Sequence, residues 1–126
     1  MVGQSGRQLK QLHKSQPFLG DDALVFDRLR FESNTMFDLA LQREILGLFH
    51  AQIEQVQLRL SQGVVSAEDH KFLGHTLCGA AASVGALELE DIGANWERLN
   101  SSGYTLAKNL QLADERFKRA TLSYRL

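Results

Sequence analysis

The sequence predicts an all-α protein, an antiparallel four-helix bundle with a short N-terminal capping helix. Apolar residues recur at the three-and-four spacing of a helix over most of the chain. Strand signals are nearly absent, because the segments "GVV" and "SVG" combine β-branched residues with glycine but are too short for strands. The periodic segments are joined by short links, which favours antiparallel neighbours around one core, and 126 residues suffice for one such domain.

The N-terminal segment differs in composition from the rest of the chain. The only proline, Pro17, lies in residues 1–23 together with three glycines. We expect a tail there, at most partly helical around "RQLKQLH". The stretch "ALVFDRLRFES" then supplies the apolar residues of the short capping helix, so the helical bundle is expected over residues 24–126.

The strongest helical pattern runs from Thr35 to about Ser61 and predicts one long amphipathic helix. Gly63 is expected to end it. Its inner positions are Leu39, Leu46, Phe49, Ile53, Val56 and Leu60, with Gln42 as the one polar member.

A second helix is expected to begin after Ser66, a suitable N-cap that has Asp69 three residues further on. Gly85 closes or kinks this helix. Its expected inner positions are Phe72, Leu73, Leu77, Ala80 and Val84.

The remainder predicts two further helices. The stretch "LELEDIGANWERLN" forms the third, with acidic residues at its start, where the helix dipole favours them, and "NSSG" as its stop. Thr105 can cap the last helix. The inner positions of these two helices are Leu89, Ile92, Trp96 and Leu99, then Leu106, Leu110, Ala113, Phe117, Ala120 and Tyr124.

Composition argues against several functional classes. Fourteen Lys and Arg stand against 15 Asp and Glu, so the chain offers no basic footprint for nucleic acid or an anionic membrane. Neither a signal peptide nor the roughly 18 continuous apolar residues of a membrane span is evident. The single cysteine, Cys78, fits a reducing compartment, and we expect the cytoplasm. No metal site is expected, because His75, Cys78 and a nearby acid lack a convincing fourth zinc ligand.

The outer face of the second helix is unusually free of large side chains. At about 100° per residue, His75 points away from the inner residues of its helix. Exposed helix faces usually carry long charged residues, and Gly79 costs about 1 kcal/mol relative to alanine. Such a face leaves room for a partner surface. The neighbours of His75 on it are Glu68, Lys71, Cys78, Gly79 and Ala82.

Two interpretations of His75 follow. An exposed, largely neutral imidazole can attack an electrophile with its free ring nitrogen, as a nucleophile reached by a large partner. Alternatively, His75 is a plain surface residue, and the small residues pack a neighbouring helix or a second copy of the chain. Periodicity alone favours this plainer interpretation. Of the other histidines, His70 is expected to be structural, whereas His50 and His13 are expected at the surface.

A family resemblance changes that balance. The stretch "HTLCGAAASVGALEL" resembles the signature of histidine-containing phosphotransfer (HPt) domains, in which a phosphorylatable histidine is followed by x-L-K-G, small residues and a hydrophobic-Gly step. Upstream, "MFDLALQREILGLFHAQIEQVQLRL" resembles the preceding helix of that family, and the similarity spans about residues 24–122. The matching positions are His75, Leu77, Gly79, Ala80, Ala81, Val84, Gly85 and Leu89.

The resemblance implies a helical phosphoryl carrier in a two-component phosphorelay. His75 would accept a phosphoryl group from a receiver aspartate or a histidine kinase and pass it to a response regulator. The implied partners are receiver domains and a histidine kinase, with Mg²⁺ on the receiver and no cofactor on this chain. A monomer is expected, and the absence of "GxxxxGK[ST]" and of a glycine-rich kinase loop argues against its own ATP-dependent kinase activity.

One departure from the family pattern matters. Three residues after the histidine the family usually has lysine, whereas this chain has Cys78. Lys71, one turn before His75, is expected to take over part of that role. The departure also leaves open a non-catalytic helical module that binds or sequesters a receiver, or dimerises. The expected docking residues are Glu68, Cys78, Gly79 and Ala82, with Leu41, Ile45 and Leu48 of the long helix, although core packing is the favoured role of these three.

Overall fold

The computed structural model describes residues 24–63 and 65–125, and regular structure in this part of the chain is helical throughout. Within these described residues, an isolated antiparallel bridge between Phe26 and Ala86 is the only β-type pairing. The all-α prediction is confirmed, whereas the predicted tail, including His13, lies outside the described residues. The helices are α3 (Arg28–Asn34), α4 (Leu39–Ser61), α5 (Ala67–Val84), α6 (Leu87–Ala94), α7 (Trp96–Ser101), α8 (Leu106–Ala120) and the 3₁₀ helix η1 (Leu122–Arg125).

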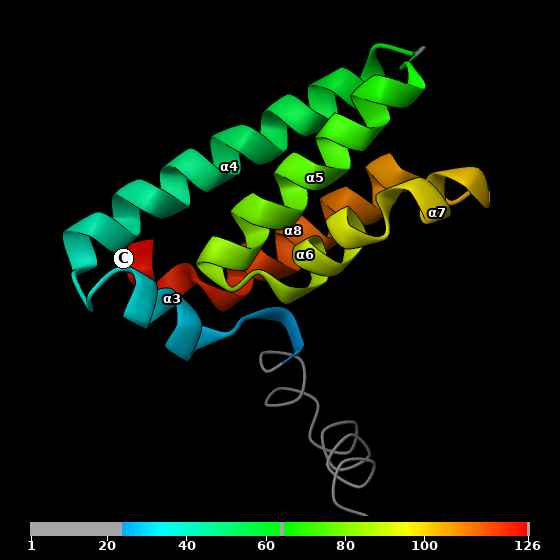
Figure 1. Ribbon diagram of the computed structural model, residues 1–126. Coiled ribbons are helices and arrows are strands. Elements are labelled where there is room, and N and C mark those ends of the chain that lie inside the picture. The colour runs from blue at the N-terminus through cyan, green and yellow to red at the C-terminus, as the bar shows by residue number, and fades with distance from the viewer. Residues whose placement is uncertain (1–23, 64, 126) are drawn as a thin grey trace, which may run out of the picture.

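The helices pack around one core (Figure 1). Helix α4 packs against α5 and α8, while α6 and α7 pack against both α5 and α8. Helices α4 and α5 lie side by side as an antiparallel pair joined at one end, and α3 lies across the other end. None of the described helices has both the length and the apolar character that crossing a bilayer requires.

The ends of α5 follow from local chemistry. Ser66 caps the first turn, because its Oγ accepts a hydrogen bond of 3.1 Å from the backbone N–H of Asp69. Gly85 ends the helix in the left-handed region, at φ 71°. The backbone N–H of Asp27 donates to the Gly85 carbonyl at 2.8 Å, which ties the segment before α3 to the α5–α6 link. Both expected ends of this helix are confirmed.

The long helix begins later than predicted, at Leu39 instead of Thr35. Thr35 ends α3, and Met36 and Phe37 then take positive φ values of 53° and 57° before Asp38 caps α4. Thr35 is buried, and its hydroxyl accepts a hydrogen bond of 3.0 Å from Gln42 Nε2. Leu39, expected inside, is 46 % exposed, since it lies in the first turn, before the contacts of α4 with the core begin.

The expected third helix is broken into α6 and α7 at Asn95. The Asn95 side-chain amide turns back and donates to the Asp91 carbonyl at 2.9 Å. The break directs Trp96 into the core, where it is almost fully buried, as expected. Thr105 does precede α8, but its side chain makes no capping hydrogen bond.

Two further expectations about burial are wrong. Phe72, expected inside α5, is 66 % exposed, because a five-residue offset turns it about 140° away from buried Leu77. His50, expected at the surface, has a side chain that is only 13 % exposed, because it faces α8. Its Nδ1 lies 3.4 Å from Asp114 Oδ1, and Lys118 Nζ lies 3.3 Å from the other oxygen of that carboxylate.

The acidic start of α6 also forms specific ion pairs, beyond the dipole effect expected there. Glu88 pairs with Arg116 of α8 at 2.7 Å, and Glu90 pairs with Arg30 of α3 at 3.0 Å. These pairs bind α6 to two neighbouring helices.

Candidate functional site

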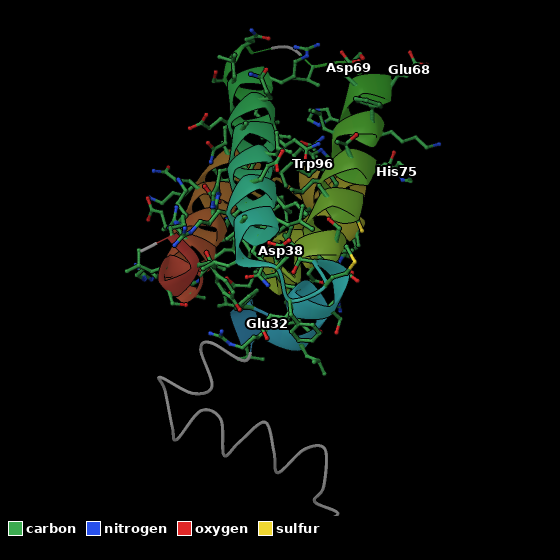
Figure 2. All side chains as sticks on the ribbon, turned by 90° about the vertical axis from the view of Figure 1, so that its left-hand side faces the viewer. Glu32, Asp38, Glu68, Asp69, His75 and Trp96 are labelled. Carbon is green, nitrogen blue, oxygen red and sulfur yellow. The ribbon has the colours of Figure 1, made fainter. Side chains whose placement is uncertain are left out.

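His75 is exposed on α5, and Figure 2 shows its ring pointing away from the body of the protein. The residues three and four positions away from His75 on the helix are Lys71, Phe72, Cys78 and Gly79. The turn before the ring therefore carries two large side chains, and the turn after it carries two small residues. The open ring nitrogens are accessible to a reactant from solvent.

A surface pocket of about 840 Å³ opens beside His75, between α5 and the α6–α7 break. We call it the His75 hollow. One wall is α5, and the other is formed by the end of α6 and the start of α7. The lining residues are Glu68, Lys71, Phe72, Gly74, His75, Cys78, Gly93, Ala94, Asn95, Trp96, Glu97 and Arg98.

Two buried glycines set the inner edge of the hollow. A Cβ on Gly74 would lie 2.6 Å from the Cβ of Trp96, and a Cβ on Gly93 would lie 2.6 Å from the backbone nitrogen of Cys78. Both distances are shorter than real Cβ contacts, so only glycine lets α5 approach α6 and α7 this closely. One turn earlier on α5, His70 also holds the indole of Trp96, because its Nδ1 accepts a hydrogen bond of 3.0 Å from the indole Nε1.

The charged side chains of the hollow have no partners within the described part of the chain. In residues 24–63 and 65–125, the cations Lys71 and Arg98 and the acids Glu68 and Glu97 form no ion pair or side-chain hydrogen bond. Most arginines elsewhere in this range are bonded, as Arg59 is to Asp69 and Arg116 to Glu88. The hollow therefore offers two cations, one from each wall, that are available to an anionic group near His75.

Only some of the residues expected around His75 share the hollow with it. Glu68, Lys71 and Cys78 line it, whereas Gly79 lies further along α5, exposed, with nothing within 4 Å of a built Cβ. Ala82 is half-buried, and its carbonyl accepts a hydrogen bond of 3.2 Å from Arg30 Nη1.

The three expected residues of α4 lie outside the hollow. Ile45 packs against the core, Leu41 is half-buried, and Leu48 is 62 % exposed. Core packing thus accounts for Ile45, while Leu48 stays available at the surface.

Phe72 and Arg98 are among the residues of the hollow that sequence reasoning missed. Phe72 lies one turn before His75 and also lines a smaller groove of about 420 Å³ between α4 and α5. Its exposure could have been found from its angle on the helix wheel. No pattern in the sequence places Arg98 at the hollow, because its position there depends on the break at Asn95.

No group of three His, Cys, Asp or Glu side chains in the described part of the chain is placed to hold a metal ion. Comparison of the chain with protein-family models, with curated proteins and with solved structures finds no match. What the protein does is therefore inferred from the chemistry of the hollow and from the motif around His75.

Proposed function

We propose that this protein is a histidine phosphotransfer protein, in which His75 carries a phosphoryl group between a receiver aspartate or histidine kinase and a response regulator. The observation that carries the proposal is an exposed imidazole at the rim of a hollow whose two cations, Lys71 and Arg98, have no partner among the residues that the structure describes. The resemblance of "HTLCGAAASVG" to the HPt signature points to the same residue. In this proposal α4, α5, α6 with α7, and α8 form the antiparallel four-helix bundle of that family, with α3 as its cap.

The chemical step needs little from this chain besides a positioned nucleophile. The lone pair of a neutral ring nitrogen of His75 forms the P–N bond while the P–O bond of the aspartyl phosphate breaks. The bonding electrons leave with the aspartate carboxylate, and the proton on the other ring nitrogen stays in place. No general base is required, and the receiver's Mg²⁺ neutralises much of the charge in transfer.

Lys71 and Arg98 would stabilise the transferred group. A phosphoryl group carries between one and two negative charges near pH 7, and three oxygens that accept charge-assisted hydrogen bonds. Because Cys78 stands where the family usually has lysine, the positive charge must come from elsewhere. Lys71 approaches from α5 and Arg98 from α7, on opposite walls of the hollow.

The surroundings of His75 fit a protein partner better than a small substrate. Phe72 offers a large exposed aromatic anchor one turn from the nucleophile, and aromatic residues dominate the binding energy of many interfaces. Gly79, on the next turn, leaves open space in which a receiver could approach the helix backbone.

The test uses a panel of receiver domains, each phosphorylated with labelled phosphate and mixed with the chain and Mg²⁺. We expect acid-labile, alkali-stable label on the wild-type chain and none on His75→Gln. Lys71→Ala and Arg98→Ala should each slow transfer by about three- to tenfold, as expected for partly exposed charges. Lys108→Ala is the matched control, since Lys108 is an exposed cation of α8 outside the hollow.

Cys78 in the lysine position specifically favours one second candidate, a module that binds or sequesters a receiver without a covalent step. That candidate predicts a stable complex with a receiver and no label on His75. In this case, Phe72→Ala would abolish binding, whereas His75→Gln would leave it intact.

A further inference from the structure

Helix α7 is attached to the rest of the protein mainly through its first residue. It has six residues, its cap Asn95 makes no side-chain capping hydrogen bond, and Trp96 is its only fully buried member. Leu99 packs at the edge of the core. Within the described residues, the bond from Trp96 to His70 is the only side-chain hydrogen bond that joins α7 to another helix.

That bond has a defined donor and acceptor. The indole Nε1–H of Trp96 can only donate, so Nδ1 of His70 must present its lone pair at 3.0 Å. The two rings lie 6.3 Å apart between centroids, tilted by 47°, so the bond, and not ring stacking, fixes their relation. Trp96 is 1 % exposed, and its N–H would have no solvent partner if His70 were lost.

The same helix carries Glu97 and Arg98 to the hollow. Arg98 has no partner in the described part of the chain, so its place opposite α5 depends on how α7 is held. A change in the direction of α7 at Asn95 would move Arg98 relative to His75.

We propose that His70 is a positioning residue of the phosphoryl site: by accepting the indole N–H of Trp96 it fixes α7 and so places Arg98 at the hollow opposite His75. The catalytic part of this inference rests on the proposed function. The structural part, that His70 holds α7, does not.

Three variants separate the bond from simple loss of packing. His70→Leu removes the acceptor, and His70→Asn keeps one, because Oδ1 of asparagine can take the place of Nδ1. Trp96→Phe removes the donor while keeping an aromatic ring in the core. Thermal unfolding of each variant establishes that it folds, and at least one of the two variants that break the bond is needed for the test.

The first measurement needs no phosphate. Amide hydrogen exchange of residues 96–101 should be about five- to thirtyfold faster in His70→Leu and in Trp96→Phe, relative to the exchange of α8 in the same sample. His70→Asn should restore slow exchange. Unchanged exchange of residues 96–101 in both bond-breaking variants would overturn the proposal.

The second measurement is a double-mutant cycle on transfer from a phosphorylated receiver. Arg98→Ala should slow transfer about three- to tenfold in the wild-type background, and have almost no further effect beside His70→Leu. If Arg98→Ala slows transfer by the same factor with and without His70→Leu, His70 does not act through Arg98. If even the wild-type chain takes up no label, the proposed function fails, while the exchange measurement still decides whether His70 holds α7.

Discussion

Gly74 lies directly beneath Trp96: a Cβ on Gly74 would be 2.6 Å from the Cβ of Trp96 and 2.9 Å from its Cγ. Gly93 approaches α5 just as closely from α6, because its missing Cβ would meet the backbone of Cys78. These contacts bring the two walls of the His75 hollow together at their base. At Gly79, one turn beyond His75 on the same helix, an added Cβ would meet nothing within 4 Å outside its own stretch of helix. The two glycines of α5 therefore have different physical roles.

The first prediction compares these two glycines. Gly74→Ala should lower the free energy of unfolding by roughly 1–3 kcal/mol, because the added methyl group forces α5 away from Trp96. Gly79→Ala should leave it unchanged or raise it by up to about 1 kcal/mol, since alanine favours helix and finds open space. Urea unfolding of the two variants decides the matter. Equal effects would mean that the close packing at Gly74 is not needed.

The second prediction concerns the open space at Gly79. Gly79→Gln should fold normally but slow phosphoryl transfer from a receiver at least about tenfold, since a long side chain would hold the partner away from His75. Gly47→Gln is the matched control, because Gly47 is an exposed interior glycine of α4 that also has nothing within 4 Å. Equal transfer rates in the two variants would exclude Gly79 from the docking surface.

The third prediction concerns the link between α5 and the segment before α3. Gly85 has φ 71°, and a Cβ there would lie 2.5 Å from the Asp27 carbonyl oxygen. Gly85→Ala should therefore lower the free energy of unfolding by more than Gly63→Ala, where φ is 93° but the space is open. Gly63→Ala should show only the conformational cost of about 1–2 kcal/mol. Equal losses of stability in the two variants would show that the approach of the added methyl group to Asp27 costs no free energy.

The fourth prediction is a loss of stability at alkaline pH that depends on Tyr124. Its hydroxyl donates to Glu32 at 2.6 Å and accepts from Arg28 at 2.8 Å. Burial, together with the bond to Glu32, raises the pKa of Tyr124 from 10.0 to about 12. Because the folded pKa exceeds the unfolded one, this stabilisation is complete below pH 10 and is lost as the pH rises towards 12.

The matched comparison is Tyr124→Phe, with the free energy of unfolding measured across that pH range. The wild-type protein should lose up to about 2–3 kcal/mol more than the variant. Parallel pH profiles would contradict the raised pKa.

The sequence was informative wherever one local signal decided the structure. Ser66 and Gly85 marked the ends of α5 correctly, because a hydroxyl cap and a left-handed glycine act within a single turn. The helix wheel also turned His75 away from Leu77, and the structure has His75 exposed and Leu77 buried.

The sequence was not informative where contacts between distant segments of the chain decide the structure. The break at Asn95 allows Trp96 to pack against Gly74 and His70 of α5. No residue near Asn95 indicates those contacts, because both partners lie more than 20 residues earlier in the chain. The sequence around His50 indicates a surface residue, and only the packing of α8 makes it a half-buried neighbour of Asp114. Arg98 reaches the hollow for the same reason, through the direction of α7.

The most direct test of the central claim is to find the atom that carries the phosphoryl group. The chain is incubated with a phosphorylated receiver and Mg²⁺, and is then examined by phosphorus NMR and by mapping of the modified peptide. We predict a single P–N species on His75 that is absent from His75→Gln. Phosphate on any other residue, or none with a receiver that binds the chain, would contradict the claim that His75 is a phosphoryl carrier.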